Sequence, residues 1–372
     1  MIKRVGVIGG GQLAWMMGAA AETLQLELVV QTPSQNDPAV RIASDRLLAS
    51  VDDASATAQM ATQVEVVTFE NEFVNLEALS LLANQGVCFY PRLQSLGPLL
   101  DKYVQRCYLR DLGLPSPTFF ALEEPHPPIE FPLVLKTRRH GYDGQGTWII
   151  RNQADLEATL AKLGDRPLLV EEFVPFEREL AAIAARSAQG EIALYPIVET
   201  QQVDQVCRRV FAPAAVSAAV AQTVEDIART LLTSLDVVGV FGIELFLTGD
   251  GRVLVNEIAP RVHNSGHFTL DACATSQFEQ HLRAVSGLSL GSPAMQVPAA
   301  VMVNLLGYEH STSDYQAKRQ RLGAIPRAYL HWYGKGEARP GRKLGHVTVL
   351  LDHDSQTARQ EIVREIEEIW YS

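Results

Sequence analysis

The sequence predicts an α/β fold that begins with a parallel sheet and takes on α+β character in its C-terminal part. Three observations carry this prediction. Residues 4–32 read as strand, glycine turn, helix and strand, which is the pattern of a βαβ unit. Two apolar runs flank Gly249-Asp250-Gly251, which is the composition of a β-hairpin turn. With 372 residues, 47% of them hydrophobic, the chain is long enough for two or three cores.

Residues 1–98 are expected to form the parallel-sheet domain. The turn after its first strand reads Gly9-x-Gly11-x-x-Ala14, a weak form of the dinucleotide fingerprint. No acid closes the second strand at Thr32, as an NAD ribose would require. The turn is therefore either a phosphate or polar-substrate cradle at a helix N-terminus, or a tight turn without a ligand. The predicted elements are strands over residues 4–8, 26–32, 64–73 and 86–90 and a helix over 12–24.

Charge and cysteine usage narrow the classes of protein. A net charge of −11 argues against general binding to nucleic acid or to anionic membranes. The four cysteines are scattered without zinc spacing, which indicates reduced thiols in the cytoplasm. Glycines interrupt the N-terminal apolar stretch, so we interpret it as strand, turn and helix and not as a signal peptide. No other run has the length of a membrane span.

Residues 99–180 are expected to form a second unit with a phosphate-covering flap. A strand over 131–136 ends in Lys136 and enters a loop with glycines at 141, 144 and 146. Glycines let backbone N–H groups approach phosphates closely. The lysine precedes the glycines, so this is not a Walker loop. A plain glycine-rich hairpin is the alternative, which the crowding of Lys136, Arg138 and Arg139 at one end makes less attractive.

Residues 181–372 are expected to form the last unit, which contains the hairpin around Gly249-Asp250-Gly251. The remaining predicted elements are helices over 101–112, 155–163, 214–235, 269–280 and 357–369 and strands over 168–174, 298–306 and 347–351, with a further strand starting at 179.

The hairpin brings Glu244 close to Asn256 and Glu257. Two neighbouring carboxylates in a sheet repel unless a cation lies between them or one is protonated. Oxygen ligands of this kind, completed by nucleotide phosphates, suit Mg²⁺. A solvated loop with two ordinary surface acids is the alternative. A strict register leaves open whether Asn256 or Glu257 faces Glu244, and we expect a bulge at the glycine turn to bring Glu257 round.

In this order, the lysine-led flap, the Val-Glu-Glu-Phe-Val strand at 170–174 and the Glu…Asn-Glu hairpin resemble the ATP-grasp superfamily. Four longer stretches, 9–13, 136–146, 256–267 and 331–346, are similar to the N5-carboxyaminoimidazole ribonucleotide synthetases of purine biosynthesis. The resemblance extends from Val5 to about Leu350. The stretches after Arg261 and around Lys335 are specific to this family, whereas the flap is specific only to the superfamily.

The resemblance implies a carboxylase. The family makes carboxyphosphate from ATP and bicarbonate and then carboxylates the 5-amino group of aminoimidazole ribonucleotide. Lys102 stands where relatives often carry an arginine near the nucleotide, and Glu179 would take the ribose hydroxyls of ATP. The ATP-binding residues implied are Lys102, Lys136, Gly141, Tyr142, Asp143, Gly144, Gln145, Gly146, Thr147, Glu171, Glu172, Phe173, Val174, Glu179, Asn256 and Glu257.

The resemblance also implies Mg²⁺ on Glu244 and Glu257, and a homodimer, as is common among relatives. The catalytic residues implied are Arg261, His263 and Asp143, and either of the last two could accept the proton of the amine. The residues implied for the ribonucleotide and bicarbonate are Gly11, Gln12, Leu13, Glu70, Glu72, Tyr142, Arg261, His263, Asn264, Ser265, Lys335 and Arg342.

Three other functions fit parts of the sequence. The nearest is another ATP-grasp ligase, such as a formate-dependent glycinamide ribonucleotide transformylase. An NAD-dependent oxidoreductase would rest on the first glycine turn, and a non-catalytic ATP-binding regulator on the flap alone. One departure from the family is His140, which occupies a flap position where relatives usually have glycine.

Overall fold

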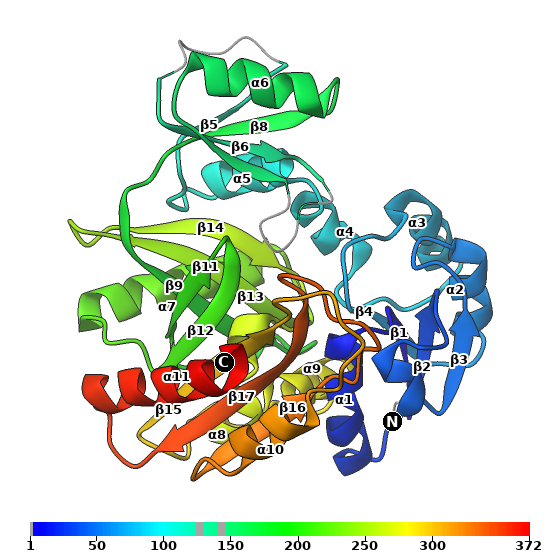
Figure 1. Ribbon diagram of the computed structural model, residues 1–372. Helices are drawn as coiled ribbons and strands as arrows, with labels where there is room; N and C mark the ends of the chain where they lie inside the picture. Colours follow the sequence, from blue (N-terminus) through cyan, green and yellow to red (C-terminus); the bar gives the residue numbers. More distant parts are fainter. Residues whose placement is uncertain (1–2, 124–129, 140, 142–145) are drawn as a thin grey trace.

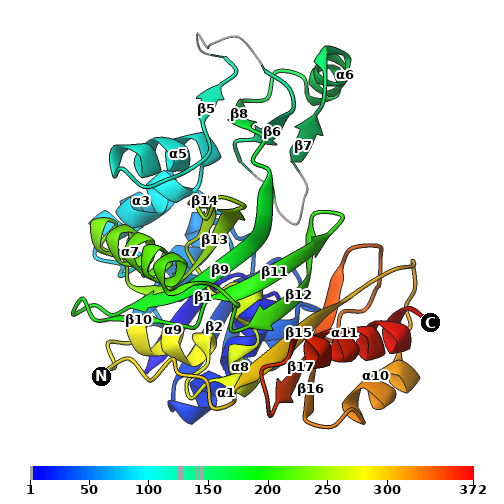
Figure 2. The same ribbon diagram turned by 90° about the vertical axis from the view of Figure 1, so that its left-hand side faces the viewer.

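The structure is a computed structural model that describes residues 3–123, 130–139, 141 and 146–372. The chain forms three sheets, and a small upper unit stands above a large central sheet, with the N-terminal sheet at its side (Figures 1 and 2). The predicted α/β fold with an α+β C-terminal part is confirmed, because the N-terminal sheet is parallel and the other two are antiparallel.

The N-terminal sheet has the strand order β3-β2-β1-β4. Strands β1, β2 and β4 are largely buried on both faces, which explains their mostly apolar sequences. The predicted fourth strand over 86–90 is wrong, since only an isolated bridge joins Val67 to Phe89. The elements are β1 Arg4–Ile8, α1 Gln12–Thr23, β2 Glu27–Thr32, η1 Pro38–Arg41, β3 Asp45–Leu48, α2 Ala54–Ala61, β4 Val66–Phe69, α3 Leu76–Asn84, α4 Leu93–Leu96 and η2 Gly97–Leu99.

The upper unit, which we call the lid, is an antiparallel sheet of order β5-β8-β6-β7 backed by α6. Asp101 caps the N-terminus of α5 by accepting hydrogen bonds from the backbone N–H groups of Tyr103 and Val104. The elements are α5 Lys102–Asp111, β5 Phe119–Ala121, β6 Leu133–Thr137, β7 Thr147–Ile150, α6 Gln153–Leu163 and β8 Leu168–Glu172.

The central sheet has nine strands, in the order β14-β13-β9-β11-β12-β15-β17-β16, with β10 beside β9. The elements are β9 Phe176–Arg186, β10 Ile192–Leu194, β11 Val198–Val203, β12 Val206–Ala212, α7 Ala218–Ser234, β13 Gly239–Thr248, β14 Val253–Ala259, η3 Asn264–Gly266, α8 Thr269–Ala272, α9 Gln277–Val285, β15 Ala299–Leu306, α10 Gln316–Gly323, β16 Ala328–Trp332, β17 Lys343–Leu351 and α11 Gln356–Tyr371.

Strand β9 sorts its side chains between two cores. Leu180, Ala182 and Ala184 lie in one core with α7, whereas Ala181, Ile183 and Ala185 lie in the other with α9 and α1. This alternation follows the two-residue period of a strand that is buried on both faces. The N-terminal sheet and the central sheet therefore share a core.

Two predicted helices differ from those observed. The helix predicted over 269–280 is interrupted, because Ser276 caps a new helix, α9, through a hydrogen bond from the Glu279 N–H. The helix predicted from 214 begins only at Ala218, after the capping residue Ser217. The predicted boundary at residue 180 falls within β9, and the division into 1–98, 99–180 and 181–372 stays a prediction.

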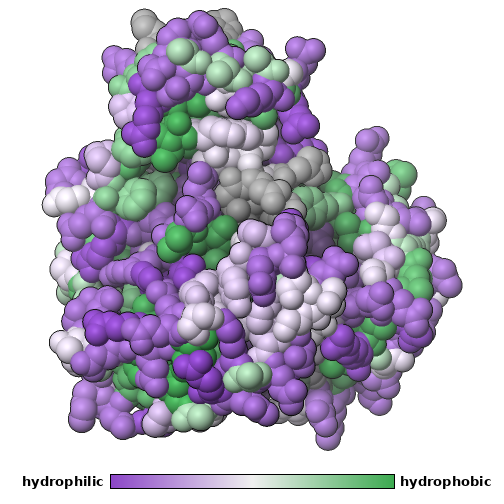
Figure 3. Space-filling view, in the orientation of Figure 1, coloured by the Kyte–Doolittle hydropathy of each residue, from purple (hydrophilic) through white to green (hydrophobic). Residues whose placement is uncertain are grey.

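The surface shown in Figure 3 is mainly hydrophilic. Hydrophilic side chains dominate the face shown in Figure 3, with hydrophobic ones in small groups between them. Among the helices of the described residues, none combines the length and the apolar character needed to cross a membrane. All four cysteines are described, and no disulfide joins them.

Candidate active site

A cleft of about 1300 Å³ lies between the lid, the central sheet and the N-terminal sheet. Its walls carry most of the described site residues that the sequence predicts. Ser265 and Gly146 are exceptions, since they do not line it. Tyr142, Asp143, Gly144, Gln145 and the variant position His140 lie outside the described residues.

The β13–β14 hairpin pairs Glu244 directly with Glu257. A β-bulge causes this, because Leu245 pairs with Val255 and Asn256 is the extra residue. The predicted position of the bulge is wrong: it lies beside Glu244 and not at the glycine turn. The Asn256 side chain also faces this group, with its amide nitrogen 3.5 Å from Glu244 Oε2.

Three carboxyl groups crowd this part of the cleft. Burial, followed by the charge of Glu257, raises the pKa of Glu244 to about 7. Burial, followed by the charge of Glu244, raises the pKa of Glu179 to about 7. Burial would also raise the pKa of Glu257, but Lys102, whose Nζ lies 2.5 Å from Glu257 Oε1, reverses the shift. An all-oxygen set of this kind, with unmet negative charge, fits a hard divalent cation.

Lys136 stands at the end of β6 and points into the cleft. Its Nζ lies 2.7 Å from Glu171 Oε2 and donates to Asn256 Oδ1 at 3.2 Å. Glu171 also accepts a 2.5 Å hydrogen bond from Arg106 Nε. Burial would raise the pKa of Glu171, but Arg106 and Lys136 lower it to about 2. The side chain of Glu171 is thus engaged with protein cations, which leaves its backbone for the ATP contact that the resemblance implies.

Arg106 is a residue that the sequence analysis missed. It reaches from α5 to Glu171 in the lid and to the carbonyl oxygens of Val255 and Asn256 in the hairpin. Its guanidinium is almost completely buried. A signal was present, because Arg106 lies four residues after Lys102 and therefore on the same face of the predicted helix.

The end of β8 and the segment after it form one wall of the cleft. Glu172, Phe173 and Val174 line it together with Glu179. The rings of Phe176 and Phe246 stack beside them, with centroids 4.7 Å apart and planes at 1°. These rings were not predicted, since aromatic residues in strands usually indicate a core. They give this wall a flat apolar surface.

The lid places further cations in the cleft. Arg138 donates from Nε to both carboxylate oxygens of Asp101, at 3.0 and 3.1 Å. Arg139 lies 3.7 Å from the same carboxylate and lines the cleft. At the two ends of the flap, Gly141 and Thr147 also line it.

The polar run after β14 crosses the floor. Arg261 forms an ion pair with Glu72, with Nε 2.9 Å from Oε1. His263 places Nε2 3.5 Å from Glu244 Oε1 and Nδ1 2.8 Å from Ser265 Oγ. The predicted role of Ser265 as a substrate residue needs correction: it is buried behind His263, which it orients. Asn264 lines the cleft and exchanges amide hydrogen bonds with Asn304.

The backbone N–H groups of the glycine turn before α1 have an acceptor within the protein. The Glu70 carboxylate accepts from the N–H groups of Gly11 at 2.6 Å and Leu13 at 3.0 Å. An internal carboxylate thus takes the place of an anionic ligand at the helix N-terminus. Both residues and Glu70 line the cleft, and a role of Gly11 and Leu13 in substrate binding stays a prediction.

The far end of the cleft is basic. Lys335, Arg342 and Lys343 line it, and all three come from the segment between β16 and the start of β17. Lys335 Nζ donates to Gln12 Oε1 at 2.5 Å and to the Lys343 carbonyl at 2.8 Å. Gln12 therefore lines the cleft and also holds the Lys335 ammonium group by a hydrogen bond.

Three family models match the chain in succession. They are the ribonucleotide synthetase preATP-grasp domain over residues 2–97, the ATP-grasp domain over 108–278 and the phosphoribosylaminoimidazole carboxylase C-terminal domain over 300–360. The ATP-grasp match covers the lid strands and the Glu244–Glu257 hairpin.

Curated relatives extend the match to the whole chain. The N5-carboxyaminoimidazole ribonucleotide synthase of Synechocystis sp. is 54% identical over 100% of this chain and 98% of its own length. The chain belongs to this family. The synthase of Synechococcus elongatus is 55% identical over 99% of this chain and 96% of its own length. N5-carboxyaminoimidazole ribonucleotide synthases are ATP-grasp ligases, so the predicted family and enzyme class are confirmed.

Solved structures of the family share the fold. The Aspergillus clavatus synthase in complex with ATP has a TM-score of 0.91, 35% identity and coverage of 99% of both chains. The same enzyme with ADP and 5-aminoimidazole ribonucleotide has a TM-score of 0.90 and 34% identity, over 98% of this chain and 99% of that one. All three ligands of those structures, ATP, ADP and 5-aminoimidazole ribonucleotide, belong to the reaction that the sequence predicts.

Proposed function

We propose that this chain carboxylates the 5-amino group of 5-aminoimidazole ribonucleotide, with ATP and bicarbonate as co-substrates and ADP and phosphate as products. One observation carries the proposal: a single cleft joins an acidic hairpin, a lysine from the lid and a separate basic end. The acidic end suits a nucleotide with its cation, and the basic end suits the phosphate of a second substrate. The charges that line the cleft thus support a site for two phosphorylated molecules.

ATP would lie between the lid and the hairpin. Lys136 and Lys102 would meet its phosphates, and the stacked pair of Phe176 and Phe246 would pack near the base. Glu172 to Val174 would offer backbone groups to adenine, and Glu179 would take the ribose hydroxyls. The raised pKa of Glu179 supports this role, since a hydroxyl donor would help stabilise its charged form.

Glu244 and Glu257 would hold Mg²⁺, because they are paired across the bulge and face the same space. Asn256 would either add its amide oxygen to the ligands of the cation or orient the Lys136 ammonium group. The cation, when bound, supplies positive charge to phosphate oxygens during transfer. The residues of the chain do the rest by holding the reacting groups in line and excluding water.

Bicarbonate would bind where Arg261, His263 and Asn264 meet the hairpin. Phosphoryl transfer to bicarbonate gives carboxyphosphate, which hydrolyses in bulk water, so an enclosed cleft is required. Lys335 and Arg342 would bind the phosphate of the ribonucleotide, and Glu70 or Glu72 would face its imidazole end. His263 or Asp143 would accept the proton that the amine loses.

The deciding experiment measures phosphate release by the purified protein with each co-substrate omitted in turn. We expect release to require ATP, bicarbonate, Mg²⁺ and aminoimidazole ribonucleotide together, and the product to carry label from ¹⁴C-bicarbonate. Equal release without the ribonucleotide would contradict the substrate assignment. Release with glycinamide ribonucleotide and formate in its place would favour the transformylase.

We further propose that the protein is a cytoplasmic homodimer. The location is supported by the biosynthetic role of the family and by the four cysteines, which are not joined in disulfides. The dimer rests on the resemblance alone. Sedimentation equilibrium, with an expected mass of twice 40.9 kDa, tests it.

A further inference from the structure

The loop that carries Lys335 is held by the N-terminal part of the chain. Besides the bond between Lys335 and Gln12, the ring of Tyr333 meets Trp15 edge-on, with centroids 6.1 Å apart. Arg41 adds a third contact, since its Nη2 donates to the carbonyl oxygen of Gly334 at 3.0 Å. All three contacts join residues more than 290 positions apart in the sequence.

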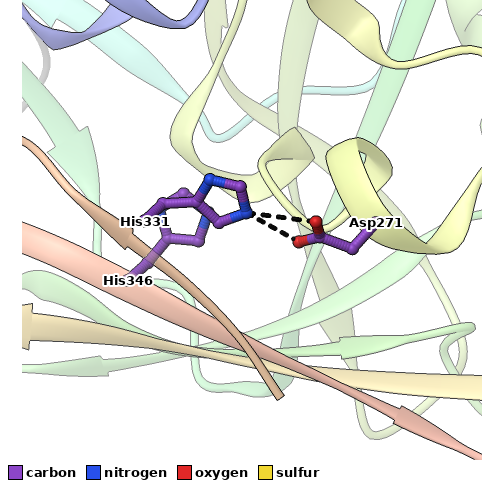
Figure 4. Close-up of side chains that lie close together, drawn as sticks. All are labelled: Asp271, His331 and His346. Atoms are coloured by element: carbon purple, nitrogen blue, oxygen red, sulfur yellow. Dashed lines mark hydrogen bonds and ion pairs between the residues drawn. The ribbon is translucent and has the colours of Figure 1, made fainter. Parts of the chain in front are cut away.

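Beneath the loop lies a support of histidines. His331 Nε2 approaches both oxygens of Asp271, at 2.9 and 3.1 Å, and the ring of His346 stacks on His331, with centroids 4.5 Å apart and planes at 15° (Figure 4). Tyr333 then bonds His346 Nδ1 through its hydroxyl at 2.8 Å. The loop is thus held by residues of β16 and β17 and also by residues of η1 and α1.

Asp271, His331 and His346 resemble a metal-ligand set, but the rings argue against this. The nitrogen lone pairs of an imidazole lie in the plane of its ring. Because the two planes are nearly parallel, an ion in the plane of His331 would lie over the face of His346 and not along one of its lone pairs. We therefore interpret the group as a hydrogen-bonded support.

Gly334 explains why Arg41 can approach so closely. Its φ is +67°, a conformation that favours glycine, and a Cβ at this position would lie 2.5 Å from Arg41 Nη1. A side chain at position 334 would therefore require the Arg41 guanidinium to shift from its observed place. Arg41 itself is exposed and does not line the cleft.

We propose that Arg41 is a positioning residue for the ribonucleotide site: by holding the carbonyl of Gly334, it fixes the adjacent Lys335 where the substrate phosphate binds. Arg41 touches no substrate and acts through Lys335. The inference rests on the proposed function, because it assigns the phosphate of the ribonucleotide to Lys335. It makes the site a composite of two distant parts of the chain.

Steady-state kinetics of Arg41→Ala test the proposal. We expect KM for the ribonucleotide to rise about threefold to tenfold, the size of effect that the loss of one ordinary hydrogen bond can have. The kcat and KM for ATP should change by less than about twofold, since the contacts of Lys136 and the hairpin are untouched. Arg41→Lys should recover part of the loss. Arg46→Ala, at an exposed arginine of β3 five residues further along the chain, is the matched control.

A double-mutant cycle tests the contact itself. Gly334→Ala should raise KM for the ribonucleotide through both the φ strain and the clash with Arg41. In the Arg41→Ala background the clash is absent, so the same substitution should have a smaller effect. Equal effects in both backgrounds would show that the two residues do not communicate.

The outcomes separate this inference from the function on which it rests. If the unsubstituted protein shows no ribonucleotide-dependent phosphate release, the proposed function fails. If it is active and Arg41→Ala retains the same KM for the ribonucleotide, only the positioning role fails. A parallel rise of both KM values with a lowered melting temperature would also overturn it, because that pattern indicates a general structural effect.

Discussion

At the scale of single residues, two neighbouring carboxyl groups of the site differ in their surroundings and in their pKa values. Glu244 and Glu257 face each other, yet only Glu257 has a lysine in contact at 2.5 Å. The pKa of Glu244 is raised and that of Glu257 is lowered as a result. A cation bound between them would remove the difference, so the pair is arranged for a ligand that carries positive charge.

Replacing Glu257 tests the cation site. We expect Glu257→Gln to raise the Mg²⁺ concentration for half-maximal phosphate release by more than about tenfold, since even residues behind a metal ligand change affinity by that amount. Asp250→Asn removes an exposed carboxylate from the same hairpin and should leave the Mg²⁺ dependence unchanged. Identical Mg²⁺ curves for Glu257→Gln and the unsubstituted protein would contradict the assignment.

A site residue can be predicted from the sequence when its partners lie close to it along the chain. Glu244, Asn256 and Glu257 could be predicted together because one hairpin carries them all. The pairing of Glu70 with the start of α1 could not, because its carboxylate arrives from another strand 59 residues along the chain from Gly11. The contact between Ser265 and His263 could not be predicted either. Nothing in the sequence distinguishes a serine that binds substrate from one that orients a neighbouring side chain.

At the scale of elements, α5 is the helix that joins the lid to the hairpin. Lys102 contacts Glu257 of β14, and one turn later Arg106 contacts Glu171 of β8 and two carbonyls of β14. The helix thus fixes the distance between the lysine of the lid and the acids of the hairpin. The sequence predicted the hairpin but misplaced its bulge, because a bulge depends on contacts with α5 and β9 that no local pattern records.

Substitution of Arg106 tests the role of α5. We expect Arg106→Met to lower the free energy of unfolding by about 3 kcal/mol, because it leaves the buried Glu171 with Lys136 as its remaining cation. It should also raise KM for ATP, since Lys136 would be held more strongly by Glu171 and less available to phosphates. Urea denaturation and ATP kinetics measure the two effects.

Arg110→Met is the matched control for Arg106→Met. Arg110 lies one turn further along α5, is exposed and pairs only locally with Asp111 among the ion pairs of the described residues. Its loss should change the free energy of unfolding by less than about 0.5 kcal/mol. Equal destabilisation by both substitutions would show that Arg106 has no special role.

At the scale of the whole molecule, buried histidines connect the parts. His281 of α9 accepts from the Val240 N–H at 3.1 Å through Nδ1, and its Nε2 lies 2.8 Å from Thr68 Oγ1. It therefore links the central sheet to the N-terminal sheet. Burial lowers the pKa of His281 to about 4, so the residue is neutral in the folded protein at pH 7.

Stability should therefore fall on acidification. In the unfolded chain His281 has its ordinary pKa near 6.5, so between pH 6.5 and 4 the unfolded state binds more protons and is favoured. The contribution of neutral His281 to the free energy of unfolding is complete above pH 6.5. About 3 kcal/mol of it is lost as the pH falls from 6.5 to 4. His281→Gln should flatten this part of the curve in denaturation measurements, whereas His353→Gln, at an exposed histidine, should not. An unchanged slope in His281→Gln would contradict the assignment.

The overall fold was largely predictable because its strands and helices have strong periodic patterns. The failures lie where the pattern is weak. Strand β3 is short and mostly exposed, and the 86–90 segment has a strand-like sequence but only a single bridge to β4. The arrangement of the three sheets around one cleft has no signal in the local sequence, and here only the resemblance to a family indicated it.

The shared core described for β9 limits how modular this protein can be. Ala14 and Met17 of α1 pack in the same core as Phe278 and Leu282 of α9, although more than 250 positions separate the two helices in the sequence. A chimera that exchanged the first 98 residues for those of a relative would therefore inherit only half of a packing interface. Because α1 and α9 pack against each other, the opening segment and α9 would have to be exchanged together.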